Sequence, residues 1–227
     1  MISNNKKFVI CGTDTDVGKT IVSSFLVQGL QASYWKPIQS GLEEGGDKER
    51  VCKLLRLSDK RIIPEAYKFK AAVSPHWAAE KEQRCINPEH LELPLVEGPL
   101  ILETAGGLMV PLNRKFLQID QLKQWDLPTI LVARSGLGTL NHTLLSIESL
   151  RKRMIPIIGI ILNGPPHKDN PYTLELFGRI PIIAHLPHLK EVNASSLQEE
   201  WDRQNLDAAF NQFQKNHTFD FKYVNPK

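Results

Sequence analysis

The residues best suited to chemistry lie in one loop near the start of the chain. The loop runs from Gly12 to Thr20 with the sequence GTDTDVGKT, directly after the apolar run at residues 8–11 and before apolar residues at helical spacing. In a strand–loop–helix arrangement of this kind, backbone N–H groups and the helix N-terminus converge on an anion. The lysine neutralises outer phosphates, and the hydroxyl that follows it completes a Mg²⁺ shell. The loop therefore predicts nucleotide binding, although five residues rather than four separate its two glycines and Thr13 takes the place of the first.

Three more polar side chains follow predicted strands. Lys36 ends a short predicted strand at residues 33–36, and Ser40 comes after it in the segment KPIQSG. Glu103 follows the apolar run 99–102 and opens the segment ETAGG, which we predict to be a flexible turn. Ligands of open parallel sheets lie beyond the carboxyl ends of the strands, and a carboxylate there reaches Mg²⁺ in P-loop proteins. The structural alternatives are a surface lysine for Lys36 and a capping or turn-forming glutamate for Glu103.

The elements that must position these residues are visible in the hydrophobic pattern. Continuous apolar runs, rather than alternating ones, predict strands buried on both faces, as in a parallel sheet covered by helices. The predicted strands are residues 8–11, 33–36, 99–102, 129–133, 157–162 and 180–184. The predicted helices are residues 47–57, 74–82, 119–125, 141–153, 172–177 and 197–213, and alternating aromatic residues predict a peripheral strand at 218–224. The sequence thus predicts an α/β fold, a doubly wound and mostly parallel sheet of the P-loop NTPase type with helices on both faces, in a single domain over residues 1–227.

Composition narrows the partners and the compartment. The chain has a formal net charge of +3 with scattered basic residues, so we predict neither nucleic-acid binding nor membrane binding. The N-terminal residues lack an apolar signal stretch, and the three cysteines lack C-x-x-C spacing, which predicts a cytoplasmic protein whose thiols are small packing residues. The seven histidines show no metal-binding pattern, and we interpret His185 and His188 as solvated imidazoles or neighbours of a bound base.

Taken in order, several segments resemble the ATP-dependent dethiobiotin synthetase family over most of the chain. They are GTDTDVGKT, WKPIQSG, SPHWAA, LETAGGLMVPL, SGLGTLNHTLL and Asn163 after the strand at 157–162. The resemblance implies a biotin-pathway ligase that converts 7,8-diaminononanoate, CO₂ and ATP into dethiobiotin, ADP and phosphate. A carbamate forms on one amine, ATP phosphorylates it, and the second amine closes the ureido ring without a protein nucleophile. The resemblance also implies ATP as cosubstrate, Mg²⁺ as cofactor and a homodimer.

The same resemblance implies catalytic and metal-binding roles. Lys19 and Lys36 would flank the developing negative charge, and Thr15 would lie near the reacting group. The implied Mg²⁺ ligands, all of them oxygen donors as a hard cation prefers, are Thr20, Asp47 and Glu103. Asp47 alone is an ordinary acidic residue at a predicted helix start, so its metal role rests on the family.

Substrate and nucleotide contacts are also implied by the family. Ser40 would hydrogen-bond the diamine or its carbamate. Gly138 and Asn141 belong to an element that crosses a homodimer interface in the family and would meet the substrate's carboxylate tail, whereas by itself the segment is a helix cap. Asn163 would recognise adenine through its amide, with residues 187–189 closing over the base. The residues implied to bind ATP are Asp16, Val17, Gly18, Lys19, Thr20, Ile21, Asp47, Glu103, Thr104, Ala105, Gly106, Asn163, Gly164, Pro187, His188 and Leu189.

Three residues depart from the family pattern. Asp16 stands where a glutamate is common, Thr104 interrupts the usual EGAGG turn, and Gly164 stands where an acid is frequent. A β-branched residue tolerates positive φ poorly. We therefore predict that Thr104 has a negative φ, that its side chain points away from the phosphate loop, and that its N–H is available to the substrate.

Two other functions fit parts of the sequence. A switch or partitioning ATPase would use the same phosphate loop, but its dimerising relatives favour a second lysine early in the loop, where this chain has Thr13, Asp14 and Thr15. An amidating ligase related to cobyrinate synthases would need a glutamine-hydrolysing domain, for which we expect no room in a chain of this length.

Overall fold

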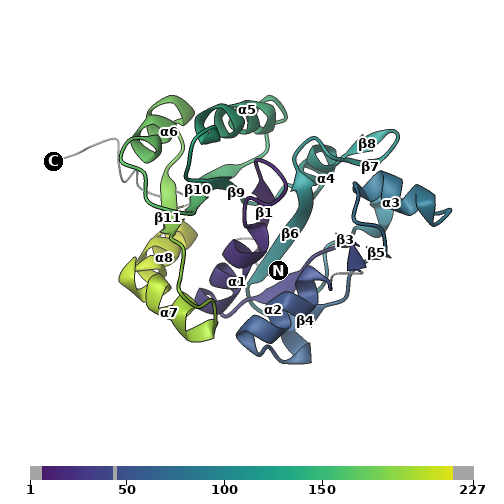
Figure 1. Cartoon of the computed structure of the whole chain (residues 1–227), viewed down its shortest axis with the longest axis horizontal. Helices are drawn as coiled ribbons and strands as arrows, with labels where there is room; N and C mark the ends of the chain where they lie inside the picture. Colours follow the sequence, from purple (N-terminus) through teal and green to yellow (C-terminus); the bar gives the residue numbers. More distant parts are fainter. Residues whose placement is uncertain (1–6, 43–44, 217–227) are drawn as a thin grey trace.

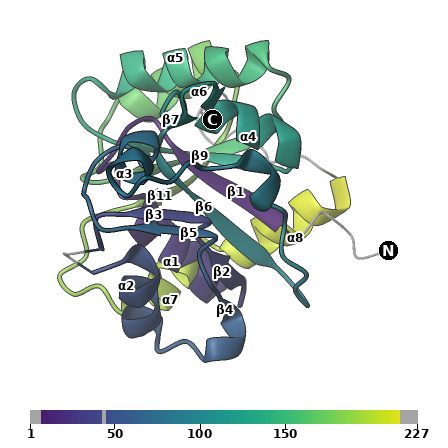
Figure 2. The ribbon, with the colours of Figure 1, turned by 90° about the vertical axis from the view of Figure 1, so that its right-hand side faces the viewer.

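The structure, a computed structural model, describes residues 7–42 and 45–216, and its centre is a seven-stranded sheet. The strand order is β11-β10-β9-β1-β6-β2-β4, and the pairings within this sheet are parallel. Its strands are β1 (Lys7–Gly12), β2 (Ser33–Trp35), β4 (Ile62–Ile63), β6 (Leu100–Gly107), β9 (Thr129–Arg134), β10 (Ile157–Asn163) and β11 (Ile182–Leu186). Helices cover both faces of the sheet (Figures 1 and 2), so the predicted fold class is confirmed.

The helices follow the predicted order along the chain. They are α1 (Lys19–Gly29), α2 (Asp47–Leu55), α3 (Pro75–Lys81), α4 (Gln118–Trp125), α5 (Thr139–Lys152), α6 (Asn170–Gly178), α7 (Ala194–Arg203) and α8 (Leu206–Asn216), with short 3₁₀ helices at Asp59–Arg61 and Pro88–His90. Two small sheets were not predicted, because their strands are too short to show a pattern. They are the parallel pair β3 (Ile38–Ser40) and β5 (Tyr67–Phe69), and the antiparallel pair β7 (Pro111–Asn113) and β8 (Phe116–Leu117).

Each face of the large sheet has its own apolar core. Phe8 and Ile10 of β1 lie in the core under α1, α2, α7 and α8, whereas Val9 and Cys11 lie in the core that α3, α4, α5 and α6 cover. Successive side chains of a strand point to opposite faces. All six residues of β1 are buried, which explains why the strand is a continuous rather than an alternating apolar run.

The prediction of one helix over residues 197–213 is wrong, because α7 and α8 are separate helices that meet at Asn205. Asn205 lies in the left-handed region with φ 51°. Trp201 of α7 and Phe210 of α8 stack with their ring centroids 5.3 Å apart. Nine residues of one straight helix would separate them by roughly 13 Å along the axis. The break at Asn205 therefore allows both rings to enter the same core.

The helix α7 packs closely on α1 at Gly29. A β-carbon on Gly29 would lie 2.1 Å from Cδ2 of Trp201, so this position leaves no room for a side chain. Trp201 is fully buried and also packs edge-on against Phe25 of α1, with ring centroids 5.4 Å apart. The contact anchors the helix that begins at the phosphate loop.

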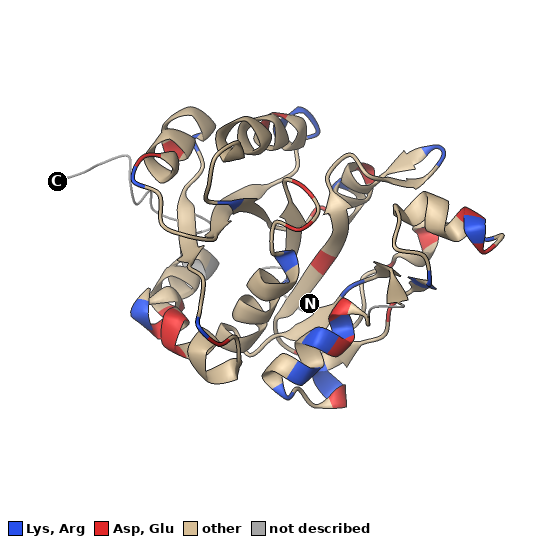
Figure 3. Ribbon diagram, viewed as in Figure 1, with Lys and Arg blue, Asp and Glu red and all other residues tan. Residues whose placement is uncertain are grey.

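The remaining predictions concern the cysteines, the distribution of basic residues, membrane binding and the C-terminal strand. Cys11 is a buried packing residue, and burial raises the pKa of its thiol to about 12, but Cys85 is exposed, so the packing prediction is wrong for Cys85. The Lys and Arg residues of the described part of the chain are spread over several elements (Figure 3). None of the helices in the described part of the chain has the length and apolar character needed to cross a membrane. The strand predicted at 218–224 lies outside the described residues.

Candidate active site

The neighbouring strands β2 and β6 bring the functional side chains to one face of the sheet. Their register pairs Tyr34 with Ile101 and Trp35 with Leu102. Because side chains alternate between faces, Tyr34 and Glu103 lie on the face under α1, and Trp35 lies on the other. Lys36 follows β2 and returns to the face of Tyr34. The register and the strand alternation together thus set Lys36 beside Glu103.

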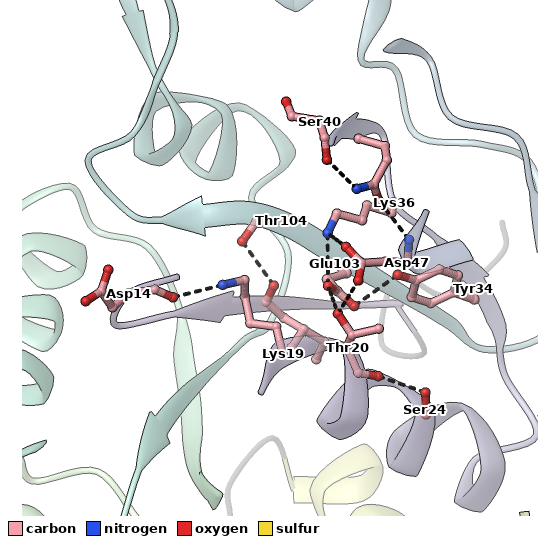
Figure 4. A network of polar contacts seen from close by, with 12 residues as sticks. Asp14, Lys19, Thr20, Ser24, Tyr34, Lys36, Ser40, Asp47, Glu103 and Thr104 are labelled. Atoms are coloured by element: carbon pink, nitrogen blue, oxygen red, sulfur yellow. Dashed lines mark hydrogen bonds and ion pairs between the residues drawn. The ribbon is translucent and has the colours of Figure 1, made fainter. Parts of the chain in front are cut away.

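A compact polar cluster at the start of α1 contains the side chains of Thr20, Lys36, Asp47 and Glu103 (Figure 4). Oε1 of Glu103 lies 2.9 Å from Oγ1 of Thr20 and 3.2 Å from Nζ of Lys36. Oδ1 of Asp47, the first residue of α2, lies 2.9 Å from the same Thr20 hydroxyl, and its Oδ2 forms an ion pair with Lys36. Glu103 is fully buried and Lys36 is 7% exposed. The structure therefore brings together the three predicted metal ligands and one of the two predicted catalytic lysines.

The donor set of this cluster fits a magnesium ion. The hydroxyl of Thr20 has one proton, yet its oxygen lies at hydrogen-bond distance from a carboxylate oxygen of Asp47 and from one of Glu103. Mg²⁺ prefers oxygen ligands and is usually held by one or two carboxylates together with substrate phosphates. Among the described residues, no three His, Cys, Asp or Glu side chains gather as metal ligands. Two carboxylates and a hydroxyl therefore suit a metal that arrives with a nucleotide.

The charges in the cluster shift one another's pKa values. Burial alone would lower the pKa of Lys36, but the charges of Glu103 and Asp47 outweigh it and raise that pKa. Burial would raise the pKa of Asp47, but the charge and hydrogen bond of Lys36 lower it. Burial lowers the pKa of Lys19, and the charge of Glu103 opposes part of that shift. Lys36 is thus held as a cation by the two acids that flank it.

The phosphate loop is ordered by its own backbone. Nζ of Lys19 donates to the carbonyl of Asp14 at 2.9 Å, so the lysine folds back over the loop. Asp16 and Gly18 have φ of 57° and 92°, and aspartate and glycine are residue types that adopt the left-handed region readily. The N–H groups of Ile21 and its successor bond the Gly18 carbonyl and begin α1. Thr15 is exposed at the tip of the loop.

The segment predicted as a flexible turn after Glu103 is the continuation of β6. Ile10 pairs with Glu103 and Gly12 with Gly107, so two steps along β1 match four along β6, and β6 carries two extra residues there. Thr104 has a negative φ, as predicted, and its hydroxyl donates to the carbonyl of Ile10 at 3.2 Å. Its side chain therefore bonds β1 and not the phosphate loop.

The last residues of β6 face the loop. Gly106 has φ 64°, and a β-carbon there would lie 3.6 Å from Oγ1 of Thr15. Ala105 is half-buried between Thr104 and Gly106. The end of β6 and the tip of the phosphate loop are thus in close contact at Thr15, the predicted neighbour of the reacting group.

Ser40 ends β3 beside this cluster. Its hydroxyl oxygen is buried and has no hydrogen-bond partner among the described residues. The neighbouring Gln39 donates to the Ser40 carbonyl at 2.7 Å and accepts from the N–H of Asp47 at 3.1 Å. A buried hydroxyl without a partner is uncommon in proteins, and it suits a polar ligand group.

The predicted adenine side lies at the other end of the phosphate loop. Nδ2 of Asn163 donates to the carbonyl of Val17 at 3.1 Å, and a β-carbon on Gly18 would lie 2.0 Å from it. A β-carbon on Gly164 would lie 2.7 Å from Oγ of Ser135, which explains a glycine where the family often has an acid. In the loop after β11, Pro187 and Leu189 are half-buried and His188 is exposed. Asn163, which is predicted to recognise adenine, thus bonds directly to the phosphate loop.

Two predicted substrate residues lie apart from the cluster. Gly138, with φ 88°, precedes α5, and Asn141 is exposed in the first turn of that helix. The core contacts of α5 are on the face of the sheet opposite α1. The structure of one chain does not bring Gly138 and Asn141 to Lys36 and Glu103.

Two polar neighbours of the predicted metal ligands were missed in the sequence. The hydroxyl of Tyr34 donates to Oε2 of Glu103 at 3.0 Å, and Gln39 accepts from the backbone of Asp47. Burial and the charge of Glu103 raise the pKa of Tyr34 well above its ordinary value. Tyr34 lies two residues before Lys36 in a strand, and that spacing places both side chains on one face. The spacing is the signal that could have found it.

Comparisons with known proteins identify similar sequences. A family model described as an AAA domain matches residues 6–196. The ATP-dependent dethiobiotin synthetase BioD of Rhodopseudomonas palustris (strain HaA2) is 45% identical over 193 residues, which are 85% of this chain and 91% of that protein. The BioD of Brucella ovis is 43% identical over 199 residues, 88% of this chain and 94% of that protein.

Two further similarities are to a longer bifunctional protein and to a solved structure. The biotin biosynthesis bifunctional protein BioCD of Bordetella avium is 48% identical over 196 residues, but the matched region is only 42% of that longer protein. The crystal structure of a ParA family ATPase from Chlorobium tepidum superposes with a TM-score of 0.54 at 15% identity, over 95% of this chain and all of that one, which shows a shared fold. Because synthetases above 40% identity are covered almost end to end, the chain belongs to the family of ATP-dependent dethiobiotin synthetases.

Proposed function

We propose that the chain is a single-domain, Mg²⁺-dependent ligase that forms dethiobiotin from 7,8-diaminononanoate, CO₂ and ATP. The observation that supports this most directly is the cluster of Thr20, Lys36, Asp47 and Glu103 at the phosphate loop, with the unpartnered hydroxyl of Ser40 beside it. Lysines, oxygen ligands and a polar acceptor site in one place are what a phosphoryl transfer to a small substrate needs. Free thiols at Cys11, Cys52 and Cys85 fit action in the reducing cytoplasm.

The reaction asks the protein mainly to position and to neutralise charge. One amine of the diamine adds to CO₂ and loses a proton to give a carbamate. A carbamate oxygen then attacks the γ-phosphorus of ATP, ADP leaves, and the second amine attacks the activated carbonyl to release phosphate and close the ring. In this scheme Lys19 and Lys36 stabilise the negative charge that develops on the transferred group. Ser40 donates to the carbamate, and Thr15 and Gly106 border the place where it reacts.

The metal and the nucleotide complete the site. Thr20, Asp47 and Glu103 would hold Mg²⁺, which would supply positive charge to neutralise the phosphates. Lys36 contacts the carboxylates of Asp47 and Glu103, so its ammonium would lie close to the phosphates of a nucleotide whose Mg²⁺ these acids hold. Asn163, which is bonded to the phosphate loop, would contact the base together with Gly164 and the loop at residues 187–189.

We also propose that the enzyme is a homodimer that uses the exposed face of α5 and α6. Large apolar side chains are exposed on these helices and in the loop before α5, namely Leu145, Leu176, Phe177 and Leu137. An apolar surface of this kind marks an interaction site more often than an ordinary monomer surface. Gly138 and Asn141 lie at its edge, so in a dimer we expect them to meet the substrate's carboxylate tail, at the end of the substrate remote from the carbamate and Ser40.

The deciding experiment supplies the purified chain with ATP, Mg²⁺, bicarbonate and 7,8-diaminononanoate. We expect mass spectrometry to detect dethiobiotin, with ADP formed in equal amount and only when both the diamine and bicarbonate are present. Water should be a poor acceptor, because the phosphoryl group is meant for a carbamate. Rapid phosphate release that is the same with and without the cosubstrates would reject the ligase and favour a switch ATPase.

A further inference from the structure

Tyr34 makes a contact with the proposed metal site that the reaction scheme leaves unused. Its hydroxyl lies 3.0 Å from Oε2 of Glu103, and the whole residue is excluded from solvent. The other carboxylate oxygen, Oε1, is the one that meets Thr20 and Lys36. The two oxygens of Glu103 therefore have different partners.

The position of Tyr34 is fixed by the sheet and not by a loop. Tyr34 pairs with Ile101 in the register of β2 and β6, and it shares a core with Ile101 and with Phe25 of α1. Its ring cannot move without disturbing that core, which is as close-packed as other protein interiors. The hydroxyl is therefore a rigid donor aimed at Glu103.

A rigid donor on Oε2 has a consequence for the carboxylate. A glutamate side chain is flexible, and a carboxylate can meet a cation with one oxygen or with two. Because Oε2 is bonded to Tyr34, Oε1 alone faces the hydroxyl of Thr20, which also contacts Oδ1 of Asp47. Outer hydrogen bonds of this kind orient metal ligands and tune their affinity.

We propose that Tyr34 is a positioning residue of the metal site, which holds Glu103 so that only one of its oxygens reaches the divalent cation of the metal–nucleotide complex. The inference rests on the proposed function, since it needs Thr20, Asp47 and Glu103 to be the metal ligands. It assigns to a buried core tyrosine a role that acts through Glu103 and never touches the substrate.

The test compares Tyr34→Phe with Tyr67→Phe. Both substitutions remove one hydroxyl from a buried tyrosine, but the hydroxyl of Tyr67 meets His90 and the backbone of Asn87, away from the cluster. The readout is uptake of Mn²⁺, followed by the electron paramagnetic resonance of free Mn²⁺, in the presence of a non-hydrolysable ATP analogue. We expect about tenfold weaker Mn²⁺ binding for Tyr34→Phe and no change for Tyr67→Phe.

Kinetic constants separate a positioning role of Tyr34 from a purely structural one. In Tyr34→Phe, added Mg²⁺ should restore most of kcat, and KM for the diamine should stay at the wild-type value. If both variants bind Mn²⁺ as the wild type does, or if both lose the same affinity, Tyr34 is only a core residue and the inference is wrong. If the wild type itself takes up no Mn²⁺ with the nucleotide analogue, the proposed metal site fails, and the inference fails with it.

Discussion

The phosphate-loop cluster and the exposed face of α5 and α6 differ in how complete they are within one chain. Glu103 and Lys36 are buried, and their charged atoms have partners on β2, α1 and α2. On the other face, Leu137 is fully exposed and Phe177 is 67% exposed. A single chain therefore builds the proposed phosphoryl-transfer site, whereas Gly138 and Asn141, the residues implied to hold the substrate's tail, stand at an exposed surface. Substitutions in the first region should affect the chemical step, and substitutions in the second should affect dimer assembly and substrate binding.

The largest effect is expected from Lys36→Met. Without the ammonium, Glu103 and Asp47 are two acids that face each other with little solvent, and removing one partner of a buried ion pair costs about 3 kcal/mol in the free energy of unfolding. Dethiobiotin formation should fall about a thousandfold, because a charge that stabilises the transition state is gone. Urea unfolding with and without Mg²⁺ and nucleotide provides the second measurement, in which the bound cation should recover part of the lost stability.

A matched control for Lys36→Met is Arg114→Met. Arg114 forms an exposed ion pair with Glu80 at 2.7 Å, and ion pairs between solvent-exposed side chains contribute little to stability. Activity within about tenfold of wild type for Lys36→Met would contradict a role in neutralising the transferred group.

Glu103→Gln and Asp47→Asn come next, since each removes a charge but little volume. Activity should fall at least about a hundredfold for Glu103→Gln, because both of its oxygens are engaged, and less for the partly exposed Asp47. Both losses should shrink as Mg²⁺ is titrated upward, while the far-ultraviolet circular dichroism stays unchanged. Wild-type rates for both variants across the titration would show that the metal ligands lie elsewhere.

Leu145→Arg tests the other side of the comparison. A charge in the exposed apolar face should disrupt a dimer, so sedimentation should shift from dimer to monomer, and KM for the diamine should rise about tenfold. Nucleotide binding should stay unchanged. Leu95→Arg is the control, because Leu95 is 92% exposed and lies outside this face. A Leu145→Arg protein that sediments and turns over like Leu95→Arg would contradict the proposed interface.

The smallest effect is expected for Thr104→Gly. The substitution removes the bond from Thr104 to the Ile10 carbonyl and adds backbone freedom, which together cost about 1 kcal/mol in the free energy of unfolding. The reaction should be retained, since the Thr104 side chain bonds β1. A loss of kcat larger than the loss of stability accounts for would place its methyl group in the reacting site.

The sequence predicted the sheet, most of its strands and the two polar residues, Lys36 and Glu103, that follow apolar strand residues. These features follow from local patterns, since continuous apolar runs mark buried strands and polar residues at strand ends meet at one edge of a parallel sheet. The two-residue spacing of Tyr34 and Lys36 places both on one face of the strand, but Tyr34 was missed because its contact with Glu103 also depends on the register of β2 against β6. The break at Asn205 was missed for a similar reason, since the stacking of Trp201 on Phe210 is tertiary. ETAGG was misread because glycines in a strand that carries extra residues look like a turn.

The packing of Trp201 on Gly29 limits how far the chain can be trimmed. The matched family region ends at residue 196, before Trp201 and before all of α8, yet it contains every residue assigned to the site. A protein cut at that point would keep Lys19 and Thr20 in its sequence. It would also expose the rings of Phe8 and Phe25, which now pack on Phe210 and Trp201. Helix α1 would then lack this packing support, so the shortest version that binds nucleotide well has to extend beyond the matched family region, through at least Phe210.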